Sequence, residues 1–218
     1  MSKLSEIIKK KGPIKKVGVI GMGYVGIPSA VLFAEKFDFV WGFQRASQSS
    51  GYKIEMLNNG ISPLKGEEPG LEDLIKKVRS HGRFESTSDF SKIKDVDAVT
   101  LAIQTPFKDK GELVPDFGAL EEGIRQIGKY LNEGVLVVLE STITPGTTKD
   151  FAVDILKEES GLIPGEDFAL AHAPERVMVG RLIQNIQEND RIVGGINKES
   201  TDRAIELYSR PLLRSYGK

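Results

Sequence analysis

The sequence predicts an α/β fold: a doubly wound, mainly parallel sheet with helices on both faces. Two observations carry this prediction. Apolar runs of strand length alternate with segments of helical spacing along the chain, which is the order that right-handed β–α–β units require. The run 135–139 (VLVVL) is apolar at every position, as expected for a strand of a parallel sheet that is covered on both faces.

A glycine-rich turn, GMGYVG, joins the first predicted strand, 17–20, to an apolar segment, 27–34, with the character of a buried helix. In a G-x-G-x-x-G turn, Gly21 allows the tight turn, Gly23 lets the backbone approach a pyrophosphate, and Gly26 lets helix and strand pack closely. The free amides at the start of the helix then face the phosphates. This context predicts a Rossmann-type dinucleotide-binding site, and a glycine-rich turn without a ligand is the alternative.

The composition is that of an ordinary globular protein. The 218 residues carry a formal net charge of -1 and no basic face, so neither nucleic acid nor a membrane surface is indicated as a partner. No apolar run reaches membrane-spanning length, and the basic segment 1–16 lacks the apolar centre of a signal peptide, so we expect a cytoplasmic protein. The chain has no cysteine, which excludes a disulfide, a zinc–thiolate site and a cysteine nucleophile within it, and no metal site is predicted.

The second predicted strand, 39–43, ends where a Rossmann fold normally places an acidic residue that binds the adenosine ribose. Gln44, Arg45, Ala46 and Ser47 occupy these positions instead. An amide and a guanidinium can accept a 2′-phosphate that a carboxylate would repel. We predict that NAD binds, held mainly by the glycine-rich turn with Gln44 and Arg45 beside the ribose, and that discrimination against NADP is weaker than usual.

Turn-forming and capping residues divide the rest of the chain into further elements. A short amphipathic helix is expected at 4–11, and a Pro/Gly-rich connection, 63–70, separates two helices. Within this connection Glu67 and Glu68 are expected at the surface. The other expected elements are helices over 52–57, 71–79, 116–131, 149–159 and 200–209, with Asp116 and Ser200 as N-caps, and strands over 83–86, 98–103, 168–172 and 191–195.

Polar residues follow three of the predicted strands. Thr105, Ser141, Thr142 and Glu175 each lie within a few residues of the end of a strand. Because ligands bind at the carboxyl ends of the strands in open α/β sheets, we expect these side chains to converge on one site. Helix capping or a turn would explain any one of them alone. His172 has no identifiable catalytic partner in the sequence and is expected to pack at the end of its strand.

Six segments of this sequence resemble, in order, those of the UDP-glucose/GDP-mannose dehydrogenase family. They are GMGYVGIPSA, ISPLKGEEPGL, QTP, ESTITPGTT, AHAPERVMVG and RIVGG, and the resemblance extends from residue 16 to residue 208. PER in place of the PEF of glucose-type members, together with RIVGG, is most similar to the UDP-N-acetyl-D-mannosamine dehydrogenases. Glucose-type members carry a second acidic residue where this chain has Val179, and mannosamine-type members tend to be apolar there.

The resemblance implies an NAD-dependent oxidation of the primary alcohol of a UDP-sugar to a carboxylate, a step of polysaccharide biosynthesis. Two hydrides would pass to two NAD molecules, with the intermediate carried on a cysteine. By motif, Tyr24 and Val25 would contact the cofactor with the glycine-rich turn, and Thr105 would lie beside the nicotinamide ribose. Ser141 and Thr142 would line the site, and Thr142 would help to hold a catalytic water.

The resemblance also implies roles for two residues near the substrate and for parts of a longer protein. Glu175 matches the glutamate implicated in acid–base work on the thioester, and Arg176 would face the sugar nucleotide. The family continues into a dimerisation domain and a C-terminal domain, with the cysteine nucleophile between them. We expect a helical arm at 1–14, the NAD-binding domain at 15–210 and a tail at 211–218, with the later domains absent. The chain is then inactive alone, and the full-length enzyme is a homo-oligomer.

Two other functions fit part of this pattern. UDP-glucose 6-dehydrogenase, or another NAD(P)-linked enzyme such as a β-hydroxyacid dehydrogenase, would also begin with a glycine-rich Rossmann turn, although ESTITPGTT and APER argue against the latter. The absence of cysteine suits a non-catalytic dinucleotide-binding module that acts as a sensor or partner domain. A turnover assay with UDP-N-acetylmannosamine and NAD separates these functions.

Overall fold

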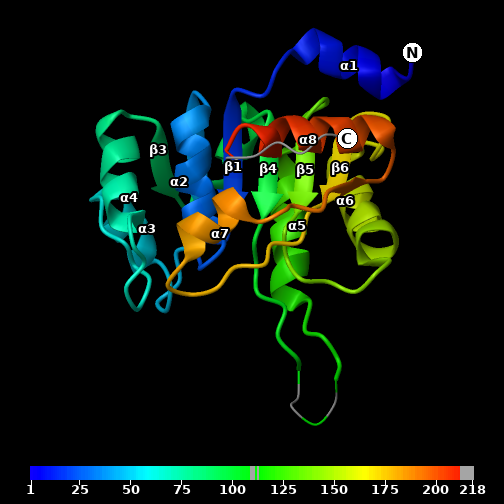
Figure 1. Cartoon of the computed structure of the whole chain (residues 1–218). Helices are drawn as coiled ribbons and strands as arrows, with labels where there is room; N and C mark the ends of the chain where they lie inside the picture. The colour runs from blue at the N-terminus through cyan, green and yellow to red at the C-terminus, as the bar shows by residue number, and fades with distance from the viewer. Residues whose placement is uncertain (109–110, 112, 212–218) are drawn as a thin grey trace.

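The computed structural model describes residues 1–108, 111 and 113–211, and in this part the chain forms a seven-stranded sheet (Figure 1). The strands are β1 (Lys16–Ile20), β2 (Phe39–Phe43), β3 (Phe84–Thr87), β4 (Ala98–Leu101), β5 (Leu136–Leu139), β6 (Ala169–His172) and β7 (Gly194–Gly195). Neighbouring strands pair in parallel, except that β7 runs antiparallel to β6. The predicted doubly wound, mainly parallel sheet is therefore confirmed. The predicted tail, 211–218, lies outside the described residues except for residue 211.

The strand order, β3-β2-β1-β4-β5-β6-β7, places β1 between β2 and β4. The chain crosses from one half of the sheet to the other after β3, because β4 pairs with β1 on the side away from β2. Ile20, at the end of β1, pairs with Phe43 of β2 and with Leu101 of β4, so the three strands end level. The carboxyl ends of β1 and β4 thus border the switch point at which open α/β sheets bind ligands.

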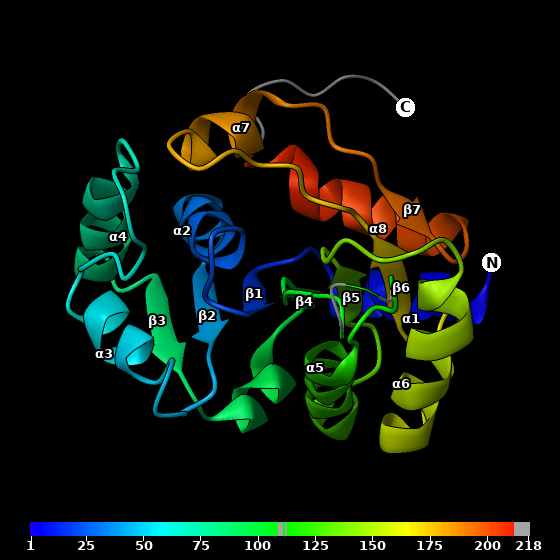
Figure 2. The ribbon, with the colours of Figure 1, turned by 90° about the horizontal axis from the view of Figure 1, so that it is seen from below.

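Helices cover both faces of the sheet (Figure 2). The helices of the described part are α1 (Lys3–Lys11), α2 (Gly26–Lys36), α3 (Tyr52–Asn58), α4 (Leu71–Ser80), α5 (Gly118–Tyr130), α6 (Val153–Ser160), α7 (Leu182–Glu188), α8 (Lys198–Ser209) and a 3₁₀ helix (Phe90–Asp95). The helix predicted over 149–159 begins as a π-helical turn, Thr148–Ala152, in which the amide of Val153 donates to the carbonyl of Thr148, five residues earlier. Among these described helices, none is long and apolar enough to cross a membrane.

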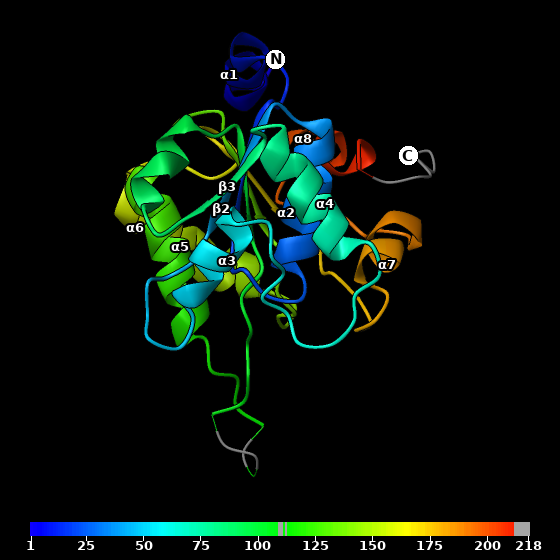
Figure 3. The same cartoon turned by 90° about the vertical axis from the view of Figure 1, so that its left-hand side faces the viewer.

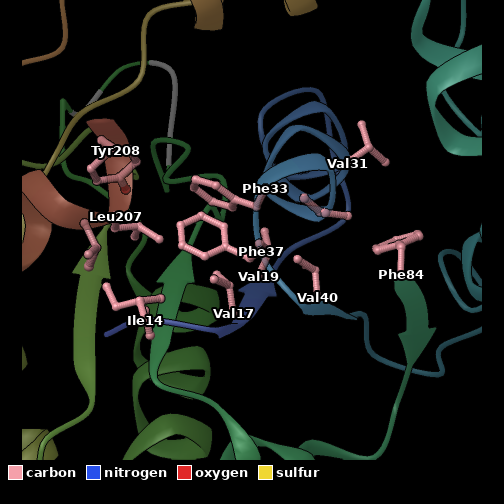
Figure 4. Close-up of a cluster of buried hydrophobic side chains, with 14 of the residues drawn as sticks. Ile14, Val17, Val19, Val31, Phe33, Phe37, Val40, Phe84, Leu207 and Tyr208 are labelled. Carbon is pink, nitrogen blue, oxygen red and sulfur yellow. The ribbon is translucent and has the colours of Figure 1, made fainter. Parts of the chain in front are cut away.

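Alternate side chains of the strands pack into two separate apolar layers, one on each face of the sheet. In β5, Leu136 and Val138 pack into the layer beneath α2, α4 and α8, whereas Val137 and Leu139 pack into the layer beneath α5 and α6. Figure 4 shows the first layer, in which Phe33 of α2, Phe37 directly after α2, and Leu207 and Tyr208 of α8 pack with the side chains of β1. Burial on both faces explains why the VLVVL run has no polar position.

Helix α1 lies beyond the amino ends of the strands, at the opposite edge from the carboxyl ends (Figure 3). Ser2 caps this helix by accepting from the amide of Ser5, and Lys3 forms an ion pair with Asp167. The helix predicted over 4–11 therefore forms, at the edge of the sheet opposite the switch point. Its lysines lie mostly on an exposed face.

Two of the predicted N-caps are wrong by one to three residues. Asn197 caps α8, because its Oδ1 accepts from the amide of Ser200 at 2.9 Å. Ser200 itself is buried, and its Oγ accepts from the amide of Leu170 in β6 at 3.2 Å. Asp116 accepts from the amide of Gly118 at 2.9 Å but lies one residue before the cap position of α5. Hydroxyl and carboxamide side chains both suit a cap, so tertiary packing decided between them.

The last predicted strand, 191–195, was too long. Only Gly194 and Gly195 join the sheet, and they pair antiparallel with His172 and Ala171. Residues 191–193 instead pass beyond the end of β6, where the side chain of Arg191 enters a buried cluster described below. Residues 191–193 thus have the apolar pattern of a strand, but they form an irregular segment that the buried side chain of Arg191 holds in place.

The glycine-rich turn holds α2 against β1 more closely than side chains would allow. A Cβ atom on Gly26 would lie 1.9 Å from the carbonyl oxygen of Gly21. A Cβ on Gly21 would lie 2.4 Å from the carbonyl oxygen of Ala102, and its φ of 96° favours glycine. A Cβ on Gly23 would meet no atom within 4 Å. The first and third glycines are thus required by the fold, whereas the second leaves open space.

Gly26→Ala should therefore destabilise the protein and Gly23→Ala should not. Because the new methyl group of Gly26→Ala must displace backbone, we expect the free energy of unfolding to fall by about 2–3 kcal/mol, a typical cost of overpacking. Gly23→Ala is the matched control and should change it by less than about 1 kcal/mol, as open positions do. Chemical denaturation measures both values, and equal losses would contradict the different roles of the two glycines.

Candidate functional site

Two adjoining pockets lie along the carboxyl edge of the sheet, which faces the viewer in Figure 2. The first, here the β2-side pocket, has a volume of about 470 Å³ and extends from the glycine-rich turn to the end of β2. The second, the β5-side pocket, has a volume of about 420 Å³ and extends to the ends of β5 and β6. Gly23, Ile103 and Gln104 line both pockets. Together they form one elongated site that meets at the switch point.

The glycine-rich turn forms the wall that the two pockets share. The amide of Gly21 donates to the carbonyl of Phe43 at 3.0 Å, which ties the turn to the end of β2. Gly21 and Gly23 line the β2-side pocket, and Gly23, Tyr24 and Val25 line the β5-side pocket. Gly26 lines neither pocket, in agreement with its packing role. The open space above Gly23 is the space that a pyrophosphate needs to approach the backbone.

Gln44 occupies the position of the usual acidic residue and is fixed by two hydrogen bonds. Its Oε1 accepts from the amide of Met22 at 3.1 Å, and its Nε2 donates to Ser50 Oγ at 3.0 Å. Arg45 follows it on the exposed rim of the β2-side pocket. Ser50 and Lys53, which the sequence reasoning did not single out, line the same pocket. Lys53 donates to the carbonyl of Met22 at 2.9 Å, and its burial lowers the pKa of the ammonium group.

The four strand-end residues predicted to converge all line the β5-side pocket. The hydroxyl of Thr105 donates to the carbonyl of Thr142 at 2.7 Å. Ser141 Oγ accepts from the amide of Ile103 at 3.1 Å, so this hydroxyl joins the ends of β4 and β5. The side chain of Thr142 is exposed toward the pocket, and the carboxylate of Glu175 closes it on the β6 side. Among the described residues, the pocket is thus lined by the exposed hydroxyl of Thr142 and by two carboxylates, those of Glu175 and of the buried Glu140.

Arg176 lies outside the residues that line either pocket. Its Nη2 donates to the carbonyl of Asp190 at 2.9 Å, and its backbone amide donates to Glu175 Oε1 at 2.8 Å. In this structure Arg176 therefore holds the loop after β6 and orients Glu175. Its contact with a substrate stays a prediction.

A buried polar cluster behind the β5-side pocket was missed by the sequence reasoning. Arg191 lies between two carboxylates: its Nη2 is 2.6 Å from Glu140 Oε1, and its Nη1 pairs with Glu175 Oε2. The side chains of Glu140 and Arg191 are 0% and 5% exposed. The hydroxyl of Tyr208 donates to Glu140 Oε1 at 2.7 Å, and the guanidinium lies 4.0 Å above its ring. A glutamate directly after an apolar strand was the one available signal.

Burial governs the ionisation of this cluster. Burial raises the pKa of the Glu140 carboxyl group, while Arg191 and the hydroxyl of Tyr208 oppose the shift. Burial also raises the pKa of Tyr208 well above its usual range, and the neighbouring Glu140 adds to the effect. Glu140 Oε2 and Arg191 Nε are buried without a hydrogen-bond partner in the described part of the chain. Two carboxylates thus share one guanidinium, with one acceptor atom left open.

The connection 61–70 lies across this edge of the molecule and corrects one expectation. Glu67 is exposed as predicted, but Glu68 is half-buried. The carboxylate of Glu68 accepts from the amides of Gly180 and Leu182 at 2.6 and 3.3 Å, at the start of α7. The hydroxyl of Tyr24 donates to the carbonyl of Lys65 at 3.1 Å. The connection therefore ties the glycine-rich turn to the loop that carries Glu175, a contact between segments more than 100 residues apart.

His172 and the acidic residues near the site show no arrangement that would hold a metal. Nδ1 of His172 lies 2.9 Å from the carbonyl oxygen of Leu139, and the half-buried position lowers the pKa of the ring. His172 thus packs at the end of β6, as predicted. Within residues 1–108, 111 and 113–211, no three His, Asp or Glu side chains are grouped so that they could bind a metal ion.

Arg191→Met should destabilise the fold in a pH-dependent manner. Removing the cation leaves two buried carboxylates without a compensating positive charge, which costs about 3–5 kcal/mol in comparable cases. Burial already raises the pKa of Glu140 and Arg191 opposes this shift, so the variant must bind a proton at Glu140 above the pH at which an unfolded glutamate does. Its free energy of unfolding should therefore recover as the pH falls from about 8 to about 5.

The matched control is Arg125→Met. Arg125 pairs with Glu121, Glu158 and Glu159 on the surface, where solvent screens the charges. We expect a much smaller loss, without recovery at low pH. Equal losses in the two variants, or a loss in Arg191→Met that does not depend on pH, would contradict the buried cluster. Denaturant titration at several pH values makes the comparison.

Comparison with known sequences places this geometry in a family. Residues 15–212 match the model of the UDP-glucose/GDP-mannose dehydrogenase family, NAD binding domain. The chain is 35% identical over 193 residues to UDP-N-acetyl-D-mannosamine dehydrogenase from Pyrococcus horikoshii. The match covers 88% of this chain and 44% of the relative. It is 38% identical over 200 residues to the protein of the same name from Campylobacter jejuni, and this match covers 88% of this chain and 46% of the C. jejuni protein.

Solved structures agree with this match. NDP-N-acetyl-D-galactosaminuronic acid dehydrogenase from Methanosarcina mazei Go1 has a TM-score of 0.95 and 70% identity, covering 97% of this chain and 45% of that one. GDP-mannose dehydrogenase from Pseudomonas aeruginosa, solved as a ternary complex, has a TM-score of 0.80 and 31% identity, covering 88% and 44%. The chain thus spans less than half the length of these relatives. NAD is confirmed as the cofactor, and this chain belongs to the UDP-glucose/GDP-mannose dehydrogenase family, whose NAD binding domain it comprises.

Proposed function

We propose that this chain is the cofactor-binding part of a nucleotide-sugar 6-dehydrogenase that oxidises UDP-N-acetyl-D-mannosamine to the uronic acid. The observation that carries the proposal is the continuous site along the carboxyl edge, which joins the glycine-rich turn to Thr142 and Glu175. The names of the P. horikoshii and C. jejuni relatives support the mannosamine substrate. The protein would then act in the cytoplasm, in polysaccharide biosynthesis, and as a homo-oligomer.

A second substrate is favoured by the M. mazei relative, whose 70% identity is higher than that of the mannosamine-type relatives above. Its name points to a nucleoside diphosphate that carries an N-acetylated galactosamine derivative. The two substrates share a nucleoside diphosphate and an acetamido sugar and differ in sugar stereochemistry. Parallel turnover assays with the two sugar nucleotides would distinguish them.

The two pockets fit the two halves of NAD. We assign the adenosine half to the β2-side pocket, where Gln44 and Arg45 lie beside the ribose, and the pyrophosphate to the open space above Gly23. The nicotinamide half would enter the β5-side pocket, past Thr105 and Ser141. Bound NAD supplies a hydride acceptor at that end of the site. Tyr24 and Val25, on the same wall, would close the site around the ring and exclude water.

Glu175 and Thr142 are the residues that we propose to act on the reacting groups. The carboxylate of Glu175 faces the pocket while Arg191 and the amide of Arg176 hold its two oxygens, so its orientation is fixed. A fixed carboxylate can accept the proton of an alcohol or of a water. The exposed hydroxyl of Thr142 can position that water. Oxidising an alcohol to an acid removes four electrons, as two hydrides for two NAD molecules, and water supplies the second oxygen.

Trapping the aldehyde covalently requires a nucleophile that this chain lacks. In the family a cysteine carries the intermediate, and the 218 residues contain none. Serine or threonine would need a nearby base for activation, and His172 is held by Leu139. The remaining machinery must come from residues beyond these 218. A non-catalytic dinucleotide-binding module is the alternative that this absence leaves open.

Gly23→Val should abolish NAD binding while the fold survives. The branched side chain would fill the space assigned to the pyrophosphate, yet a Cβ at this position meets no atom within 4 Å. Gly194→Val is the matched control, because a Cβ there also meets no atom and the residue lies in β7. Calorimetry with NAD measures the loss. NAD binding retained in Gly23→Val would place the phosphates elsewhere and refute the assigned site.

The 218-residue chain alone should bind NAD and form no uronic acid. The test incubates the purified chain with UDP-N-acetylmannosamine and NAD and measures NADH and the sugar acid. Addition of the cysteine-bearing domains of a relative as a separate chain should restore activity, and their cysteine-to-alanine variant is the control. Net acid from the chain alone would contradict the need for an external nucleophile. Failure of the complemented mixture, with NAD still bound, would favour the non-catalytic module.

A further inference from the structure

We propose that the cofactor site also accepts a phosphate on the adenosine 2′-oxygen, so that NADP binds in the same site as NAD. The inference rests on the proposed placement of adenosine in the β2-side pocket and concerns the chemistry of that end. NAD-specific Rossmann sites place a carboxylate at the end of β2, where it binds the ribose hydroxyls and repels a 2′-phosphate. The end of β2 in this chain has the opposite electrostatic character.

The residue at the carboxylate position is neutral and fixed. Gln44 has its Oε1 engaged by the amide of Met22 and its Nε2 engaged by Ser50 Oγ. Gln44 therefore keeps the glycine-rich turn against the end of β2 without placing a negative charge beside the ribose. The segment 44–54 contains no acidic residue. A 2′-phosphate would meet no like charge from this segment.

Two cations and a group of hydroxyls lie where the phosphate would project. Arg45 is exposed on the rim of the pocket, and in the described part of the chain its side chain forms no ion pair. The ammonium group of Lys53 lies deeper and donates to the carbonyl of Met22. A planar guanidinium can donate two parallel hydrogen bonds to a phosphate, and an ammonium adds a point charge.

Three serines complete this corner of the pocket. Ser47 Oγ lies 2.6 Å from Ser50 Oγ and 3.3 Å from Ser49 Oγ. All three line the β2-side pocket, and each hydroxyl can rotate to donate to an anion. The amide of Gly51 donates to the carbonyl of Ser47 at 2.7 Å, which keeps the serines on one turn next to Arg45. These hydroxyls currently satisfy one another, an arrangement that a phosphate oxygen can replace.

Carboxylates are scarce around the rest of the pocket. Among the described residues that line it, the one acidic side chain is Glu122, which belongs to α5 rather than to the turn after β2. Its Oε1 accepts from Gln126 Nε2 at 2.9 Å. The ribose end thus combines Arg45, Lys53 and three hydroxyls with no carboxylate of its own.

The experiment uses the 218-residue chain, which contains every residue of this pocket. Calorimetry compares adenosine 5′-monophosphate with adenosine 2′,5′-bisphosphate, which differ only in the 2′-phosphate, and then NAD with NADP. The 3′,5′-bisphosphate tests whether the position of the phosphate matters. We expect the 2′,5′-bisphosphate to bind about tenfold more tightly than the monophosphate, the scale of one hydrogen bond to a charged group. NADP should bind within about tenfold of NAD.

Variants assign the effect to the named residues. Arg45→Gln should weaken binding of the 2′,5′-bisphosphate about tenfold and that of the monophosphate less than about threefold. Gln44→Glu should weaken the ligands with a 2′-phosphate more than those without it, because it restores the usual carboxylate. Arg83→Gln is the matched control, since Arg83 is an exposed arginine that immediately precedes β3, at the opposite edge of the sheet. The advantage of the 2′-phosphate should grow as the pH rises through about 6, its second pKa.

Two results would overturn the inference. In the first, NAD binds, but NADP binds at least about 100-fold more weakly than NAD, and the 2′,5′-bisphosphate binds at least about 100-fold more weakly than the monophosphate. This result would show that the site rejects the 2′-phosphate. The other is equal weakening of both adenosine phosphates by Arg45→Gln, which would make Arg45 a general contact to adenosine. Loss of all binding, NAD and the monophosphate included, would instead refute the proposed cofactor site itself.

Discussion

The close approach of Gly26 to the carbonyl of Gly21 is the constraint on which the rest of the structure depends. The contact leaves room for no Cβ, and Gly21 in turn lies against the carbonyl of Ala102 in the neighbouring strand segment. Two glycines thus bring β1, β4 and the start of α2 to one point. This point is the switch in strand order, so the same contacts that close the core also shape the wall shared by the two pockets.

Polar contacts over long sequence separations then connect this point to the far side of the site. Glu68 and Lys65 link the glycine-rich turn to the loop after β6, and Arg191 links that loop to the end of β5. Tyr208 extends the network into the apolar layer beneath α8. The carboxyl edge is therefore held by buried charges as well as by strand pairing, since hydrophobic packing alone does not fix the orientation of a carboxylate.

Local patterns in the sequence were sufficient to predict the fold, the glycine-rich turn and the strand ends that line the β5-side pocket. The strands are continuous apolar runs and the turn is a G-x-G-x-x-G motif, so both follow from neighbouring residues. The strand ends that line the β5-side pocket follow from topology. The cluster of Glu140 and Arg191 does not, because the partners are 51 residues apart and each stands at one end of an ordinary apolar run. Glu68 was likewise expected in solvent, since sequence alone does not reveal the distant amides that bury it.

The two carboxylates of the buried cluster differ in burial and in the partners of their oxygens. One guanidinium faces two carboxylates, and the proton balance belongs to the pair. The Glu140 side chain is 0% exposed and burial raises its pKa, whereas Glu175 is 7% exposed and accepts from the amide of Arg176. Glu140 Oε2 has no hydrogen-bond partner among the described residues and is the atom left for a proton. The raised pKa thus belongs to Glu140, whereas both oxygens of Glu175 are held at the pocket by Arg191 and by the amide of Arg176.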